Sequence, residues 1–131
     1  MNNIEFKNML DALSDAWQHK NYAAAVEVFA DEIQYADPLR YKLDGKAQLR
    51  AFFEADDGYE QRTVWHTIIF DEERQLGAAE YTFDGTHRYH GMVIIKLRDD
   101  RISHWREYQH ISELEWESLW TGAGIRAPRP T

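Results

Sequence analysis

The stretch "TVWHTIIFDEERQLGAAEYTFDGTHRYHGMVIIKLRDDRISHWREYQH" (63–110) decides the fold class of this chain. Apolar and polar residues alternate within it over four runs: 63–72, 75–84, 87–98 and 101–110. Alternation with a period of two is typical of β-strands, because successive side chains point to opposite faces of a sheet. The connections between the runs are short and turn-like, so the four strands are predicted to form an antiparallel meander.

The residues before this stretch predict mainly helices. Apolar residues recur with helical spacing over 4–19, and Asn21 is placed to cap a second short helix that ends near Phe29. A short strand is expected over 33–37, where IQYAD alternates and then meets a proline, and a third helix is expected over 46–56.

The residues after the meander predict a final helix. Ser112 and Glu115 form the pattern of a capping box, and Leu114, Trp116, Leu119 and Trp120 would lie on the helix that follows and ends at Gly122. A single domain is therefore expected over 1–122, with a flexible tail over 123–131. Helices that precede a long meander favour an α+β fold, with the helices packed on one face of a curved antiparallel sheet.

The composition excludes several classes of function. The 131 residues have a formal net charge of −8 and no basic stripe, so nucleic acid and anionic membranes are not expected as partners. The chain has no cysteine, no pattern of a signal peptide and no apolar run near the ~18 residues of a membrane span, which together predict a cytoplasmic protein.

The strand over 87–98 carries apolar residues on both of its faces. Met92 and Ile94 lie on one side, and Val93 and Ile95 lie on the other. An antiparallel sheet with helices on one side usually leaves its other side polar. The second apolar face therefore predicts a second cover, for which we expect another copy of the chain, in a homodimer joined through the outer sheet face.

The segment "VFADEIQYADPLRYKLDGKAQLRAFF" (28–53) resembles the pattern of the NTF2-like superfamily, and more narrowly of its SnoaL-like group. The run "RISHWREY" (101–108) is similar to the closing strand of that group. The resemblance implies a cone-shaped α+β fold with a cavity between the helices and the curved sheet. Members bind small, mostly apolar molecules there, and their activities include isomerisation, dehydration, aldol cyclisation and epoxide hydrolysis. Others serve in transport or assembly without catalysis.

The resemblance also places an acid/base site. In ketosteroid isomerases the aspartate before the proline is the general base, and its counterpart here is Asp37. The two acids that stabilise the dienolate oxygen in those enzymes correspond to Leu13 and Val93, so a ketosteroid isomerase is not expected. Glu107 would point into the cavity as a second acid or base, with Tyr35 as a hydroxyl donor.

Five aromatic residues complete the predicted site as apolar walls that bind the ligand: Trp17, Phe53, Tyr81, Tyr89 and Trp105. Tryptophan and tyrosine suit such a cavity, because each combines an apolar body with one polar tip. The same rings would also suit a solid aromatic core, and that alternative stays open.

Each candidate has a structural alternative. Asp37 is also the residue type that begins a turn before a proline, and Glu107 is able to serve as a bonded core carboxylate without chemistry. No metal site or cofactor is predicted, because His87 and His90 lie three apart on a strand and point to opposite faces. Trp116 and Trp120 would either pack the last helix or form a lid over the cavity.

The leading hypothesis is a small-molecule-binding protein that acts as a cofactor-independent acid/base enzyme, of isomerase, dehydratase, cyclase or hydrolase type, on a small apolar substrate. One alternative is a non-catalytic ligand-binding or assembly protein. A second is a structural dimerisation module, whose cavity would be filled by its own side chains.

Overall fold

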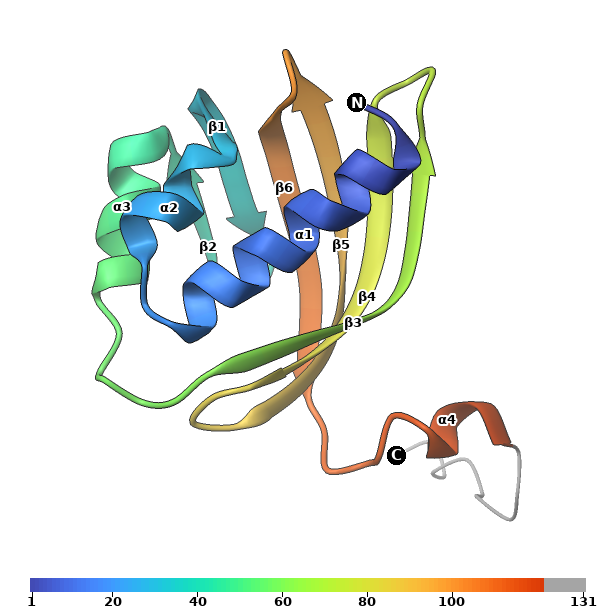
Figure 1. The fold of residues 1–131 in the computed structure, drawn as a ribbon. Helices are drawn as coiled ribbons and strands as arrows, with labels where there is room; N and C mark the ends of the chain where they lie inside the picture. The colour runs from blue at the N-terminus through green and yellow to red at the C-terminus, as the bar shows by residue number, and fades with distance from the viewer. Residues whose placement is uncertain (122–131) are drawn as a thin grey trace.

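The computed structural model describes residues 1–121, which form four helices and one six-stranded sheet (Figure 1). The helices are α1 (Asn3–Gln18), α2 (Tyr22–Glu27), α3 (Lys46–Glu54) and α4 (Ser118–Thr121). The strands are β1 (Phe29–Asp37), β2 (Tyr41–Asp44), β3 (Arg62–Asp71), β4 (Leu76–Asp84), β5 (Arg88–Arg98) and β6 (Arg101–Ile111). The predicted α+β class is confirmed.

The strand order in the sheet is β2-β1-β6-β5-β4-β3. The meander β3–β6 is antiparallel throughout, as predicted. The sheet as a whole is mixed rather than antiparallel, because β1 pairs with β6 in parallel. A parallel pair needs a long connection, and here all the elements from β2 to β5 lie between the two partners in sequence.

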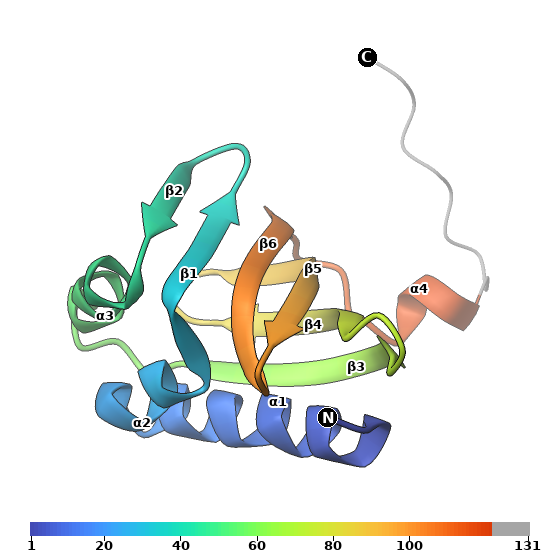
Figure 2. The ribbon, with the colours of Figure 1, turned by 90° about the horizontal axis from the view of Figure 1, so that it is seen from above.

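Helices α1, α2 and α3 lie on one face of the curved sheet, and α1 crosses it diagonally (Figures 1 and 2). The side chain of Asn2 caps α1 in a capping box with Glu5, which fixes where the helix begins. The apolar stripe Phe6, Leu10 and Leu13 is fully buried against the sheet. The indole of Trp65 on β3 donates a 3.0 Å hydrogen bond to the Leu10 carbonyl and so ties helix to sheet.

The sheet buries one face and leaves the other largely open. Val93 and Ile95 are fully buried beneath the helices, whereas Met92 is 41% exposed and Ile94 is half-buried on the outer face. The two-sided apolar pattern of β5 is therefore present in the folded chain. Tyr108, opposite Met92 on β6, is also exposed.

Two strands differ from the prediction. β1 begins at Phe29 rather than residue 33, and a register shift between Phe29 and Gln34 breaks the alternation that would have revealed its first half. The short strand β2 follows the turn at Pro38 and pairs with β1; the sequence analysis left it out because four residues carry little periodicity.

The predicted start of the C-terminal helix is wrong, since α4 begins at Ser118 and not directly after Ser112. His90 Nε2 lies 2.6 Å from the Leu114 carbonyl, and Arg88 Nη1 donates to the carbonyls of Glu113 and Leu114. These bonds to β5 occupy the backbone acceptors that a helix starting at Ser112 would use. The predicted end at Gly122 and the tail over 123–131 lie outside the described residues.

The two tryptophans of this segment do not cover the cavity. The Trp116 ring stacks on the imidazole of His66 at 4.1 Å, and Trp120 is 76% exposed. His66 also bonds to Thr82, which points away from the buried face of β4, so Trp116 lies against the outer side of the sheet. Neither tryptophan lines the cavity, so of the two alternatives for these residues the lid is not the arrangement found.

Candidate functional site

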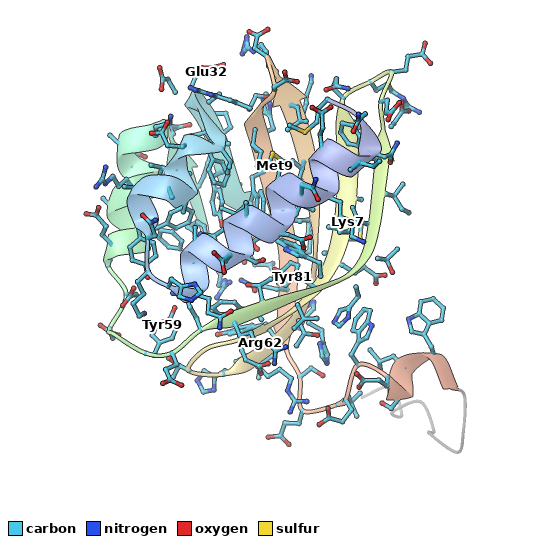
Figure 3. The ribbon with its side chains drawn as sticks, in the orientation of Figure 1. Lys7, Met9, Glu32, Tyr59, Arg62 and Tyr81 are labelled. Atoms are coloured by element: carbon cyan, nitrogen blue, oxygen red, sulfur yellow. The ribbon has the colours of Figure 1, made fainter. Side chains whose placement is uncertain are left out.

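A cavity of about 480 Å³ lies between the helices and the concave face of the sheet. Its walls are mostly aromatic and include every residue that was predicted as a wall: Trp17, Phe53, Tyr81, Tyr89 and Trp105. Figure 3 places Tyr81 in the interior behind α1 and Tyr59 on the loop that follows α3, and both residues line the cavity. The open volume contradicts the structural-module hypothesis, which predicts a cavity filled by side chains.

Glu107 lies in this cavity and accepts hydrogen bonds from three tyrosine hydroxyls. Tyr81 donates to Oε2 at 2.7 Å, while Tyr35 and Tyr41 donate to Oε1 at 3.2 Å and 3.3 Å. The three donors come from β4, β1 and β2, so three separate strands converge on one carboxyl group of β6. Glu107 is itself 6% exposed. The geometry is that of a buried acidic group held in place by neutral donors.

Burial raises the pKa of Glu107, because removal from water penalises the charged carboxylate. The three tyrosine hydroxyls and the nearby Trp105 indole oppose that effect by favouring the charged form. The Trp105 Nε1 acts only through its proximity, since it forms no hydrogen bond with an acceptor in the described part of the chain. Burial likewise raises the pKa values of Tyr35, Tyr41 and Tyr81, so all three remain protonated donors.

Stacked rings fix the directions of the two weaker donors. The Tyr35 ring lies between Trp105 and Tyr41, with centroid distances of 5.4 Å and 6.3 Å and nearly parallel planes. The strand register explains why these rings stack, because Tyr35 pairs with Trp105 in the β1–β6 ladder. With ring rotation restricted, the hydroxyls of Tyr35 and Tyr41 are held toward the same carboxylate oxygen.

Asp37 is buried on the same face as Tyr35, but its carboxylate is engaged elsewhere. Oδ1 accepts a 3.0 Å bond from the Leu39 backbone N–H, and Oδ2 accepts a 2.9 Å bond from Arg40 Nε. Asp37 lines a second, smaller cavity rather than the one that holds Glu107. The structure thus brings Tyr35, Glu107 and the five wall residues together and leaves Asp37 at the end of β1, where it bonds to the turn that follows.

Among the lining residues that the sequence analysis missed, Tyr41 and Arg40 bear directly on Glu107 and Asp37. Tyr41 donates to Glu107 from the unpredicted strand β2. The one feature of the sequence that indicated this position is that Tyr41 follows Asp37 by four residues, which lets the two residues pair across the β1–β2 turn. Arg40 lines the main cavity as well, with its guanidinium 5.8 Å from the ring centroids of both Tyr41 and Tyr89. Its position follows from the tight turn at Pro38.

A second polar group borders the cavity where the loop after α3 begins. The Tyr22 hydroxyl donates to Asp56, Lys20 Nζ lies 3.2 Å from the same carboxylate, and Gln61 donates to the Tyr22 oxygen. The hydrogen bond from Tyr22 lowers the pKa of Asp56, and burial raises that of Tyr22. Asp56 is therefore an ionised carboxylate with its own cation, unlike Glu107.

Among residues 1–121, no three histidine or carboxylate side chains gather into a candidate metal site. His87 and His90 do not meet, since His87 lies against Tyr89 while His90 bonds to Thr82 on the outer face. The described helices include none that is long and apolar enough to cross a membrane.

The model of the SnoaL-like domain matches residues 10–105. The chain belongs to the SnoaL-like domain family. The match covers the second half of α1, all of α2 and α3 and most of the sheet, and it ends two residues before Glu107. A search of curated protein sequences finds no significant match for this SnoaL-like protein.

Solved structures share the fold of this SnoaL-like protein at low identity. A protein of unknown function with a cystatin-like fold from Methylobium petroleophilum is 15% identical, with 100% of this chain and 98% of that chain covered and a TM-score of 0.75. An NTF2-like protein of unknown function from Burkholderia xenovorans is 16% identical, with coverages of 98% and 99% and a TM-score of 0.74. An LEH-like epoxide hydrolase from M. tuberculosis is 17% identical, with coverages of 82% and 84% and a TM-score of 0.72. These likenesses establish the fold alone.

Proposed function

We propose that this SnoaL-like protein is a cofactor-independent enzyme that moves a proton of a small, largely apolar substrate, with Glu107 as the acid/base group. The observation that carries the proposal is the buried Glu107 carboxyl, which borders an open aromatic cavity and receives three tyrosine hydroxyls. A carboxyl group with a raised pKa is suited to exchange protons near neutral pH.

The tyrosines give the site a way to stabilise developing charge. The bonds from Tyr35 and Tyr41 to Glu107 Oε1 are the longer ones, at 3.2 Å and 3.3 Å. When Glu107 takes a proton from the substrate, its oxygens need fewer donors, and a released hydroxyl is free to donate to an oxyanion on the substrate. These hydroxyls would supply the hydrogen-bond donors to an oxyanion that Leu13 and Val93 cannot provide.

Asp37 has a different role in this proposal. Its bonds to Arg40 and to the Leu39 backbone close the turn that carries Tyr41 to the cavity. Asp37 is therefore a positioning residue rather than the base, and its effect on the reaction acts through Arg40 and Tyr41.

Turnover assays on two variants test the proposal. Substrates would be screened by reaction class: isomerisation, dehydration, cyclisation and epoxide opening. Glu107→Gln keeps the volume and removes the titrating group, and we expect turnover to fall by about 100- to 10,000-fold. Asp37→Asn should retain much more of it. Equal turnover by Glu107→Gln and the wild type would reject Glu107 as the proton carrier.

A non-catalytic ligand-binding role is the second candidate. It is favoured by the hydrogen bonds of the Glu107 carboxyl, which already accepts three tyrosine hydroxyls of the protein itself. A ligand that is bound and recovered unchanged after prolonged incubation, with no reaction class turned over, would support binding over catalysis.

We also propose that two copies of the chain associate through the outer sheet face. Exposed apolar side chains at Ile69, Met92 and Tyr108 support this assignment. A partner copy would remove them from water without closing the cavity, which lies on the opposite face of the sheet.

A further inference from the structure

The charge balance of the main cavity is uneven. Three acidic residues line it, Glu107, Asp56 and Asp57, against one basic residue, Arg40. Asp56 has Lys20 as its cation, and Arg40 is paired with Asp37 outside the cavity lining. None of the ion pairs formed by residues 1–121 includes Glu107. Its ionised form therefore lies in a buried place with hydrogen-bond donors but no positive charge.

The walls around Glu107 are of the kind that accepts a positive charge. The faces of Trp, Tyr and Phe rings carry negative potential, and a desolvated cation within ~6 Å of such a ring is attracted to it. Arg40 already illustrates this at the rim, where its guanidinium lies 5.8 Å from the rings of both Tyr41 and Tyr89. Further in, the rings of Trp17, Phe53 and Tyr81 line the same cavity, and Tyr81 bonds directly to Glu107.

We infer that the molecule bound beside Glu107 is an organic cation, a compound with a substituted ammonium group on a small apolar body. The ammonium would supply the missing counter-charge to Glu107, and its alkyl groups would lie against the ring faces. The same carboxylate, when ionised, disfavours anionic compounds. The inference rests on the proposed function, because it names the substrate class of the same site.

The inference also bears on the proton transfer. A bound cation favours the ionised form of a neighbouring carboxyl group, so Glu107 would be present as the base when the ligand is in place. The C–H bonds next to a positively charged nitrogen are more acidic than those of a hydrocarbon, which makes them suitable donors. Ligand charge and the protonation of Glu107 are thereby coupled.

A pair of isosteric probes tests the inference. Choline and 3,3-dimethylbutan-1-ol have the same shape and differ only in whether the central atom is a charged nitrogen or a neutral carbon. Binding to the full chain at mildly alkaline pH would be followed by calorimetry or by tryptophan fluorescence. We expect choline to bind the wild type about tenfold or more tightly than the neutral alcohol.

Two variants locate the effect. Glu107→Gln should abolish the preference for choline while the neutral alcohol still binds, which also shows that the variant is folded. Asp57→Asn, which removes a carboxylate from the same cavity, should leave the preference unchanged. A preference that persists in Glu107→Gln would overturn the inference, and so would its loss in Asp57→Asn.

The binding test and the turnover test fail in different ways. Equal binding of both probes by the wild type, or binding of neither, overturns the cation inference and leaves Glu107 open as the acid/base group for a neutral substrate. A clear choline preference with no loss of turnover in Glu107→Gln supports the cation inference and rejects the catalytic proposal.

Discussion

Replacement of Tyr81 by phenylalanine tests how the carboxyl group of Glu107 is held. The substitution keeps the ring, which packs edge-to-face against Trp65 at 5.7 Å, and removes only the hydroxyl. That hydroxyl makes the shortest of the three bonds to Glu107, at 2.7 Å. A hydrogen bond to a charged group contributes about 1.5–3 kcal/mol to stability, against about 1 kcal/mol for a neutral pair.

The loss should therefore depend on pH. The Tyr81 bond favours the ionised form of Glu107 and so lowers its pKa relative to burial alone. Below pH 4.5, the ordinary pKa of this carboxyl, Glu107 is protonated in the folded protein and Tyr81→Phe should cost only about 1 kcal/mol. As pH rises through the raised pKa of Glu107, the cost should grow toward about 2–3 kcal/mol.

Urea unfolding followed by tryptophan fluorescence measures this difference. With a urea dependence of about 1–3 kcal/mol per molar, the midpoint should fall by roughly 1 M at the alkaline end of the range. Tyr89→Phe is the matched control, since Tyr89 lines the same cavity without a bond to Glu107. A pH-independent loss, or one no larger than that of Tyr89→Phe, would refute the proposed link between Tyr81 and the ionised carboxylate.

Three other measurements address the carboxyl group, the packing and the interface. Because the pKa of Glu107 is higher in the folded chain than in the unfolded one, wild-type stability should fall as pH rises through it, and Glu107→Gln should flatten that slope in urea titrations. Gly77→Ala would place a Cβ 2.5 Å from the Phe6 ring and 3.0 Å from a backbone oxygen, so thermal unfolding should show a loss of about 1–3 kcal/mol; an unchanged melting curve contradicts that packing. Sedimentation at micromolar concentration should show twice the chain mass for the wild type and a monomer for Met92→Glu, and a wild-type monomer would exclude the homodimer.

The part of the fold that could be predicted is the part whose local pattern agrees with its final environment. The meander was visible because each strand alternates and each connection is short. Bulges hide such a pattern: at the start of β6, Ile102 and Ser103 are both buried because the register shifts between Lys96 and Leu97. In the C-terminal segment a local pattern was present but misleading. Ser112 begins a capping-box pattern, yet no helix starts there, because side chains of β5 bond to the carbonyls that follow.

The candidate site also has features that the sequence could predict and features that it could not. The direction of Glu107 follows from alternation along β6, once the resemblance has indicated which face is concave. Its donors do not follow, because Tyr35, Tyr41 and Tyr81 come from strands far apart in sequence, and their meeting depends on strand order. The role of Asp37 could not be predicted either, because a buried aspartate before a proline is compatible with a general base and with a turn residue. The hydrogen bond from Arg40 shows that Asp37 stabilises the turn.

One of the two positions that correspond to the oxyanion donors of an isomerase lies next to Glu107. Val93 faces the cavity side of β5, and its partner in the β5–β6 ladder is Glu107. An acidic group is therefore present one strand away from the place where the resemblance implies one. Side chains directly opposite each other in a ladder have Cβ atoms about 4.5–5.5 Å apart, so a carboxyl on β6 reaches much of the same space.

The hydroxyl donors of this site come from the sheet and not from α1. Leu13 on α1 is fully buried and apolar, but three hydroxyls from the sheet converge on Glu107. Acid and donors thus lie on the sheet wall and are bonded to one another, whereas α1 contributes the ring of Trp17 to the cavity lining. A ligand with one polar or charged end and an apolar body fits this division, with its polar end at Glu107 and its body toward the helices. Both the catalytic and the binding proposal require this orientation. The effect of Glu107→Gln on turnover, compared with its effect on choline binding, distinguishes between them.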